Sequence, residues 1–433
     1  MYADTINSDT ALIDTALASA ITLNIPEKGV PKELAQWRKA AYSDVRYRLH
    51  FDIPEKRSKR VDGRIAVSLG LREPEDIVLD FREPASSIHS VKVNGHTVPR
   101  EHLSAQENVS HGNGSPERNI SHGEEARGEN AGIQHSCIIA NEHIIIPAAM
   151  TRSGENTVEI AFTAGDQSLN RNDSFLYTLL VPERARTLFP CFDQPDMKAL
   201  YTLSLEVPAD WKAVSNTYIE KEELIHTGDA AEVHAAMRKL ITFSRTEPLS
   251  TYLFSFVAGE FYRKDYDDGR HRFSAYYRET DTAKTAQLDD IFAEVAASLE
   301  WLEEYTGVPY PFAKYDFIIL PGFQYGGMEH TGATLYNDGR MFLSPNPTLG
   351  DRLSRTELIA HETAHMWFGD LVTMKWFDEV WTKEVFANHF AAWISEPLYP
   401  EVNHRLNRLR SFNTSALSED RTEGTVSISQ ELP

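Results

Sequence analysis

Cysteine and positive charge are both scarce in this sequence. Its 433 residues contain only two cysteines, Cys137 and Cys191, which excludes a disulfide framework. The 43 lysines and arginines stand against 64 aspartates and glutamates, so the formal net charge is −21. Phosphate backbones and anionic lipids repel such a protein. The composition therefore argues against nucleic acid and anionic membrane surfaces as partners.

Long hydrophobic runs are also missing. No apolar stretch approaches the roughly 20 residues that a membrane-spanning helix needs. The first 25 residues have no basic segment ahead of their mildly apolar part, so they do not predict a signal peptide. A form from which a signal had been removed would look the same, so a cytoplasmic and an extracytoplasmic location both stay open. The oligomeric state also stays open.

From Tyr42 onward, short segments alternate between apolar and polar residues. This period of two is typical of half-buried strands, and the pair Asn94-Gly95 favours a tight hairpin turn. Many short strands with turn signals predict an all-β domain, which we place at residues 42–261 after an N-terminal extension of residues 1–41. The predicted strands lie within 45–51, 64–71, 76–81, 90–98, 144–146, 157–162, 201–207 and 239–243.

Residues 104–132 interrupt this pattern. They are rich in Asn, Gly, Ser, Glu and His, with almost no large apolar residue, and so predict a long exposed insertion. After residue 261 the pattern changes to mixed helix and strand. Residues 281–305 carry an apolar stripe at helical spacing, and residues 316–320 are typical of a buried strand. The predicted fold class is therefore multi-domain α+β.

One stretch in the second half carries chemistry. His361, Glu362 and His365 spell H-E-x-x-H, and residues four apart lie on one face of a helix. Two neutral imidazoles on one face suit zinc, and a catalytic zinc usually keeps a third protein ligand and one open position. Glu362 directly follows the first histidine, from where its carboxylate reaches the bound water as a general base. The alternative is an amphipathic helix whose two histidines are satisfied polar residues.

The third ligand should come from a second helix packed against the first. The acidic candidates after the motif are Asp370, Asp378, Glu379 and Glu384. The first three lie where a helix end or a turn is expected, whereas Glu384 lies within residues 381–394, which predict a helix. The small residues Ala387 and Ala391 on that helix would let the two helices approach closely around an ion. We therefore favour Glu384.

Three motifs together carry a resemblance to a known family. Glu384 follows His365 after 18 intervening residues, residues 326–330 read G-G-M-E-H, and residues 190–195 read P-C-F-D-Q-P. In this order they resemble the aminopeptidase N-type zinc metallopeptidases, gluzincins related to leukotriene hydrolase. The resemblance runs from about residue 42 to the last residue.

The resemblance implies a fold, a cofactor and an activity. It implies a saddle-like N-terminal β domain followed, at residues 262–433, by a thermolysin-like α+β catalytic domain. It also implies one zinc ion per chain, held by His361, His365 and Glu384, with Glu362 as the catalytic base. The activity implied is removal of N-terminal residues from peptides.

The resemblance also implies how a peptide is held. The substrate-binding residues that it indicates are Gly326, Gly327, Met328 and Glu329. Glu329 would hold the free α-ammonium group of the substrate by charge-assisted hydrogen bonds. The backbone groups of the two glycines would pair with the peptide main chain as a strand does. Peptides with a free N-terminus are therefore the expected partners.

The sequence departs from the family pattern at several positions. Asparagine is usual where this chain has His330, Asp370 and Lys383. Many members carry an acid or amide that helps to bind the substrate amine where this chain has Val181. Another group would then do this work here, or amine recognition would depend mainly on Glu329.

The family also places a tyrosine well downstream of the glutamate ligand, where it stabilises the oxyanion. The only tyrosine after Glu384 is Tyr399, which is too close to that ligand, and the chain stops at Pro433. We therefore expect a truncated form with a C-terminally incomplete catalytic domain. Loss of one oxyanion donor typically lowers the rate by about two to three orders of magnitude.

Three other functions stay open at this point. One is a zinc endopeptidase, against which Glu329 argues. Another is a non-catalytic or impaired peptide-binding fragment of the family; the intact ligands and base argue against it for the parent protein, but the expected truncation leaves it open for this chain. The third is epoxide hydrolysis in addition to peptide cleavage, as in leukotriene hydrolase. No residue of this sequence specifically indicates that activity.

Overall fold

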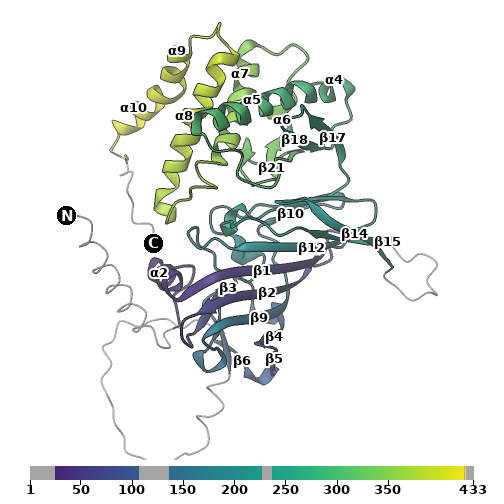
Figure 1. Ribbon diagram of the computed structural model, residues 1–433, viewed down its shortest axis with the longest axis vertical. Coiled ribbons are helices and arrows are strands. Elements are labelled where there is room, and N and C mark those ends of the chain that lie inside the picture. The colour runs from purple at the N-terminus through teal and green to yellow at the C-terminus, as the bar shows by residue number, and fades with distance from the viewer. Residues whose placement is uncertain (1–24, 107–135, 227–236, 424, 426–433) are drawn as a thin grey trace, which may run out of the picture.

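The computed structural model describes residues 25–106, 136–226, 237–423 and 425. A β-rich region comes first, and a region of mixed helices and strands follows it (Figure 1). Three long helices, α5 (Leu288–Thr306), α7 (Leu349–His365) and α8 (Val380–Leu398), gather at one end of the molecule, opposite the largest sheet (Figure 1). The predicted multi-domain α+β fold class is confirmed.

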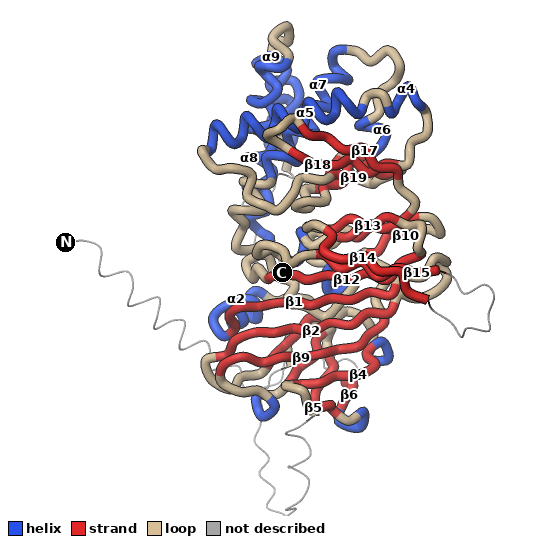
Figure 2. Tube along the Cα trace, turned by 45° about the vertical axis from the view of Figure 1, so that its right-hand side comes forward, coloured by secondary structure: helices blue, strands red, loops and turns tan. Residues whose placement is uncertain are grey.

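The β-rich region is built from three sheets, whose strands Figure 2 shows in red. The eight-stranded sheet runs in the order β14 (Ile219–His226), β15 (Met237–Phe243), β12 (Leu200–Pro208), β1 (Tyr42–Asp52), β2 (Asp62–Leu71), β9 (Gly154–Thr163), β4 (Ile88–Val93) and β5 (His96–Val98). One four-stranded sheet runs β10 (Leu169–Arg171), β11 (Phe175–Thr178), β16 (Phe256–Gly259), β13 (Lys212–Ser215). The other runs β3 (Ile77–Asp80), β8 (His143–Ile146), β7 (Cys137–Ala140), β6 (Leu103–Gln106).

Alternation along the chain decides which strand faces enter the core. In β1, Tyr47, Leu49 and Phe51 are buried while the residues between them are exposed or half-buried. The turn between β4 and β5 has positive φ at both Asn94 (52°) and Gly95 (83°), which is the backbone that a two-residue hairpin needs. Each segment that the sequence predicts as a strand overlaps a strand of the structure, and residues 90–98 form parts of two, β4 and β5.

The predicted N-terminal extension contains a helix that the sequence analysis did not predict. This helix, α2 (Lys32–Ala41), buries Leu34 and Trp37 in the core. Arg38, also fully buried, donates hydrogen bonds to both carboxylate oxygens of Asp80 in β3, at 2.9 and 2.5 Å. Residues 32–41 are therefore part of the packed β-rich region, while residues 1–24 lie outside the described residues.

The predicted insertion begins later than expected. Residues 103–106 form β6, which pairs in parallel with β7, so the sheet includes the first three residues of the predicted segment 104–132. The remainder of that segment lies outside the described residues.

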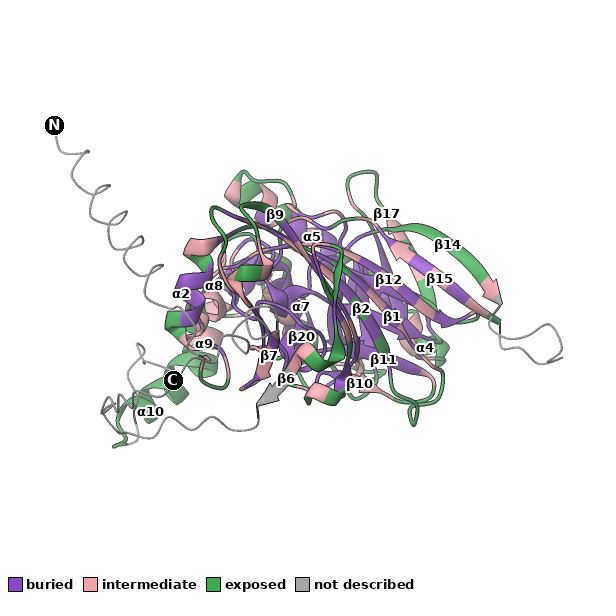
Figure 3. Ribbon diagram, turned by 90° about the horizontal axis from the view of Figure 1, so that it is seen from below, coloured by how far each residue is buried: buried purple, intermediate pink, exposed green. Residues whose placement is uncertain are grey.

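The second region is built on a five-stranded sheet. Its strands, in spatial order, are β17 (Tyr262–Asp267), β18 (Arg272–Tyr277), β19 (Phe317–Leu320), β21 (Thr334–Asn337) and β20 (Gly327–Met328). The shorter helices of the region are α4 (Thr282–Thr285), α6 (Asp338–Met341), α9 (His404–Arg408) and α10 (Thr414–Asp420). Figure 3 shows α10 as an exposed element. Among the described residues, no helix is long and apolar enough to cross a membrane.

The helix predicted over residues 281–305 is split in two. The side chain of Gln287, between α4 and α5, bonds both the backbone N–H and the carbonyl of Leu343, at 3.1 and 2.9 Å. This link to a distant loop replaces continuation of the helix. The apolar stripe of α5 is buried as predicted, and Gly307 ends the helix with a φ of +67°.

Sheet membership changes between β16, which ends at Gly259, and β17, which begins at Tyr262. We therefore propose a domain boundary near residue 261. Buried hydrogen bonds cross it: Asn216 donates to the Thr331 carbonyl at 2.8 Å, and the Tyr252 hydroxyl donates to the Gly369 carbonyl at 3.0 Å. The two regions are thus held together at the face that carries the site described next.

Candidate functional site

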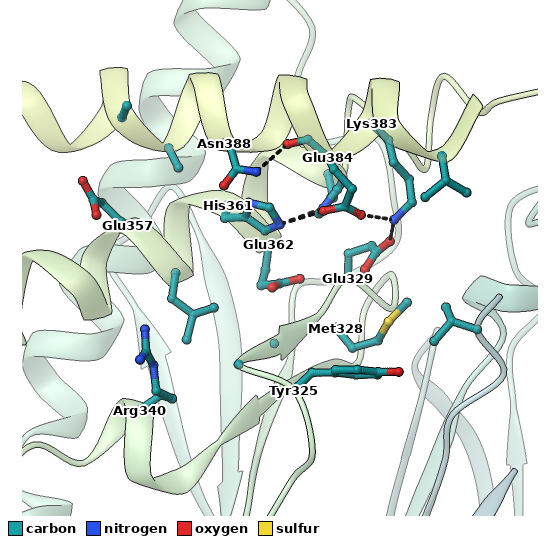
Figure 4. A pocket seen from close by; sticks show the side chains of 18 of the residues that line it. Tyr325, Met328, Glu329, Arg340, Glu357, His361, Glu362, Lys383, Glu384 and Asn388 are labelled. Carbon is teal, nitrogen blue, oxygen red and sulfur yellow. Dashed lines mark hydrogen bonds and ion pairs between the residues drawn. The ribbon is translucent and has the colours of Figure 1, made fainter. Parts of the chain in front are cut away.

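Two helices position the motif residues. A capping box at Thr348 and Asp351 starts α7, with hydrogen bonds of 3.1 and 2.9 Å that satisfy the first backbone N–H groups. The helix runs to His365, so that His361 and His365 lie one turn apart. Helix α8 packs alongside, and its small residues Ala387 and Ala391 are buried. This brings Glu384 to the two histidines (Figure 4).

The three side chains converge at a spacing that suits a metal ion. The Nε2 atoms of His361 and His365 are 3.0 Å apart, and Oε2 of Glu384 is 3.4 and 3.7 Å from them. Ligand distances of about 2.0–2.2 Å in a tetrahedron put neighbouring donor atoms roughly 3.3 Å apart. These residues therefore fit a four-coordinate ion with one open position. A second group of possible donors, Glu329 with Glu362 and His365, shares His365 but offers only one histidine.

A hydrogen bond behind the metal-facing side orients one histidine. Nδ1 of His365 lies 3.2 Å from the carbonyl oxygen of Phe368. A carbonyl only accepts, so Nδ1 carries a proton, and Nε2 is the ring atom that faces Glu384. This is the arrangement that a neutral imidazole ligand needs.

Glu362 is buried and lines the same cavity as the three converging donor groups of His361, His365 and Glu384. Burial, reinforced by the charges of Glu329 and Glu384, raises its pKa to about 8, although His361 opposes the shift. A cation bound by His361, His365 and Glu384 would lower this pKa and favour the ionised carboxylate that a general base needs. Gly327 makes room for it, because a Cβ there would come within 2.3–2.5 Å of the Glu362 side chain.

Glu329 is paired inside the protein. Nζ of Lys383 donates to Oε1 of Glu329 at 2.5 Å and to Oε1 of Glu384 at 2.7 Å (Figure 4). Burial would raise the pKa of Glu329, but the charges of Lys383 and His365 outweigh it and lower the pKa to about 2. Burial likewise opposes ionisation of Glu384, whose pKa is nonetheless held below its usual range by His361, His365 and Lys383. Both carboxylates are therefore ionised.

The donor groups, Glu362, Glu329 and Lys383 all line one cavity of about 550 Å³. The structure brings together in its wall every site residue expected from the sequence, namely Gly326, Gly327, Met328, Glu329, His361, Glu362, His365 and Glu384. Met328 and Gly327 form β20, which is the edge strand of the five-stranded sheet. Its outer side therefore carries backbone groups that have no neighbouring strand, beside the carboxylate of Glu362.

The positions that depart from the family pattern also have defined places. Val181 lies in the cavity wall and offers no polar group there. His330 and Asp370 are fully buried, and neither side chain has a hydrogen-bond partner among the described residues. Burial lowers the pKa of His330 to about 4 and raises that of Asp370, so burial favours the neutral form of each side chain. Tyr399 bonds Thr356 at 2.9 Å and does not line the cavity.

Lys383 is the residue of the site that sequence reasoning missed. Adjacent residues on a helix point about 100° apart, so a lysine next to Glu384 is not expected to face the same ion. It reaches the site because Glu329, from the loop after β20, lies opposite the first turn of α8. The departure from asparagine at this position was the available signal.

The chain matches two models of one family. Residues 43–253 match the peptidase M1 N-terminal domain, and residues 291–433 match the peptidase family M1 domain. Similar proteins include Aminopeptidase M1-A of Oryza sativa subsp. japonica, 31% identical over 264 residues, which are 58% of this chain and 29% of that protein. Glutamyl aminopeptidase of Bos taurus is 34% identical over 211 residues, which are 48% of this chain and 21% of that protein.

A third relative aligns with most of the chain. Aminopeptidase N of Lactococcus lactis subsp. cremoris is 28% identical over 388 residues, which are 89% of this chain and 41% of that protein. The chain thus spans less than half the length of the curated relatives it matches. The two matched domains follow each other as the N-terminal β-rich region and part of the catalytic region, and the chain belongs to peptidase family M1.

Proposed function

We propose that the site removes N-terminal residues from peptides with the help of one bound zinc ion. The observation that carries this proposal is the convergence of three donor atoms, those of His361, His365 and Glu384, within 3.0–3.7 Å of one another. The second support is the placement of two further acids, Glu362 and Glu329, in the same cavity. The three donor atoms suit zinc, Glu362 lies close enough to serve as the base, and Glu329 can bind the substrate's amine.

The residues of the chain divide the reaction between them. When bound, zinc polarises the scissile carbonyl and lowers the pKa of a water molecule. Glu362 accepts a proton from the attacking water and returns it to the leaving amine nitrogen. The edge of β20 holds the peptide backbone extended. Glu329 receives the α-ammonium group, which fixes the register so that only the first peptide bond reaches the reacting position.

The test compares a short peptide that has a free N-terminus with its N-acetylated twin, each with and without a chelator. Cleavage of the free peptide only, lost with chelator and restored by zinc, is the expected result. Hydrolysis is followed by chromatography of the released amino acid, and zinc content by atomic absorption.

Each other result contradicts a named part of the proposal. Equal cleavage of both peptides would indicate an endopeptidase and remove the role of Glu329 as the amine anchor. Cleavage that survives complete zinc removal would contradict the metal-assisted mechanism. Cleavage of neither peptide by the zinc-loaded chain would contradict catalysis by this chain and favour a peptide-binding fragment.

Gly327 offers a test of the position of the base. In Gly327→Ala the new methyl group would lie 2.3–2.5 Å from the Glu362 side chain, which would therefore have to move. A displacement of about 1 Å can reduce catalysis on the order of 100-fold, so we expect kcat to fall by about that factor with zinc content unchanged.

Gly326→Ala is the matched control. There the nearest atom to the new methyl group is the flexible end of Leu358, at 3.1 Å, and Glu362 is not among the neighbours. We expect this variant to keep kcat within about threefold of the parent chain, since no reacting group is displaced. A larger loss in Gly326→Ala than in Gly327→Ala would show that the backbone just before β20, and not the space around Glu362, controls kcat.

A further inference from the structure

Lys383 is surrounded by groups that would suit an ammonium ligand. Its Nζ atom lies 2.5 Å from Glu329 and 2.7 Å from Glu384, and 5.8 Å from the ring centre of Tyr252. The side chains of Lys383 and Glu329 are only 11% and 6% exposed. Figure 4 shows the lysine descending from α8 to end between the two carboxylates. The chain thus supplies a cation of its own to the acid that would hold the substrate amine.

An incoming α-ammonium group meets two obstacles at this acid. Oε1 of Glu329 already accepts a charge-assisted hydrogen bond from Lys383. The positive charge of Lys383 also repels a second cation, and the repulsion is weakly screened because the pair is buried. Binding the amine at Glu329 therefore requires it to share, or replace, an existing ion pair.

We propose that Lys383 is a specificity-determining residue that competes with the substrate's α-ammonium group for Glu329 and so weakens selection of free N-termini. The proposal rests on the role of Glu329 given under Proposed function. A site with a neutral residue at this position would distinguish a free amine from its absence more strongly than this site does.

Binding of two matched ligands isolates the amine from every other contact. Leucine hydroxamate and 4-methylpentanohydroxamic acid share the same side chain and the same zinc-binding group, and differ only in the amine. The dissociation constant of 4-methylpentanohydroxamic acid divided by that of leucine hydroxamate, measured by calorimetry on the zinc-loaded chain, reports amine selection alone. Any effect of a substitution on zinc affinity or on folding acts on both ligands and cancels in the ratio.

Removing the charge of Lys383 should raise this ratio. A hydrogen bond to a charged group contributes enough for an increase of about tenfold or more in Lys383→Met. Lys383→Gln, which keeps hydrogen bonding without the charge, should show the same direction. Lys383→Arg keeps the cation and should leave the ratio near that of the parent chain. Adding Glu329→Gln to Lys383→Met should abolish the increase, since the acid that both cations seek is gone.

An unchanged or lowered ratio in both Lys383→Met and Lys383→Gln would overturn the proposal, and so would an equal rise in Lys383→Arg. Peptide hydrolysis is measured separately on the parent chain. Hydrolysis of free peptides with an unchanged ratio leaves the proposed function standing and removes the role of Lys383. A raised ratio without hydrolysis supports the competition and contradicts catalysis.

Discussion

Glu362→Gln is expected to lower kcat by about two to four orders of magnitude while zinc remains bound. The amide has nearly the shape of the carboxylate but accepts no proton at neutral pH, so the attacking water keeps its own. Glu362 is not one of the three converging donor groups, which are His361, His365 and Glu384. Steady-state kinetics on a peptide with a free N-terminus, combined with zinc analysis of the same sample, checks both parts of the expectation.

Glu357→Gln provides the matched control on the same helix. Glu357 also borders the cavity, but its carboxylate accepts a hydrogen bond from Asn407 at 3.1 Å and faces away from His361 (Figure 4). Because it exchanges no proton with substrate, its replacement should change kcat less than about tenfold. Wild-type kcat in Glu362→Gln, or equal losses in the two variants, would show that another group is the base.

The second large effect concerns stability. Arg38→Met should lower the free energy of unfolding by about 3–5 kcal/mol, because it leaves the fully buried Asp80 without its strongest partner. Methionine keeps apolar bulk against Phe192, whose ring lies 5.5 Å from the guanidinium carbon. The loss then reports the ion pair and not a cavity. Urea unfolding at pH 7, followed by circular dichroism, measures it.

An exposed ion pair between residues of β1 and β9 is the control. Arg46 and Glu155 are 2.8 Å apart but 44% and 61% exposed, so Arg46→Met should change the free energy of unfolding by at most about 1 kcal/mol. Similar losses of unfolding free energy in Arg38→Met and Arg46→Met would mean that burial does not increase the contribution of the Arg38–Asp80 pair to stability.

The contribution of Arg38 should also depend on pH. Burial alone would raise the pKa of Asp80, but Arg38 and His143 outweigh it and hold the pKa below its usual range. A carboxyl whose pKa is lowered on folding stabilises the folded state above its unfolded pKa of about 3.9 and loses this as pH falls. The difference in the free energy of unfolding between the parent chain and Arg38→Met should therefore become smaller below about pH 4. A gap that stays constant on acidification would contradict this assignment.

The sequence predicts what depends on local pattern. The alternation in residues 45–51 is enough to predict β1, and Asn94-Gly95 predicts the hairpin of β4 and β5, because period and turn chemistry are local properties. The predicted helix over residues 381–394 favours Glu384 among the acids after the motif, and the family resemblance implies the same residue; the structure places Glu384 in α8, beside the two histidines.

Features that depend on distant partners were not predicted. Helix α2 owes its place to a buried arginine whose partner, Asp80, is 42 residues away in the chain. The break before α5 depends on Gln287 bonding Leu343, 56 residues later. Lys383 faces the site because Glu329, 54 residues earlier, lies opposite it. In each case the residue type alone suggested a solvated surface side chain.

The brevity of β20 has a consequence for which proteins the proposed site could process. An edge strand of two residues can form only a few backbone hydrogen bonds with a bound peptide. Only the first few residues of a target therefore have to be extended, but binding requires that they are. An N-terminus folded into a helix or sheet would have to fray before entering. The rate of trimming would then follow the local unfolding equilibrium of the target's terminus, so that hydrogen-exchange protection there would rank a set of targets by how fast they are shortened.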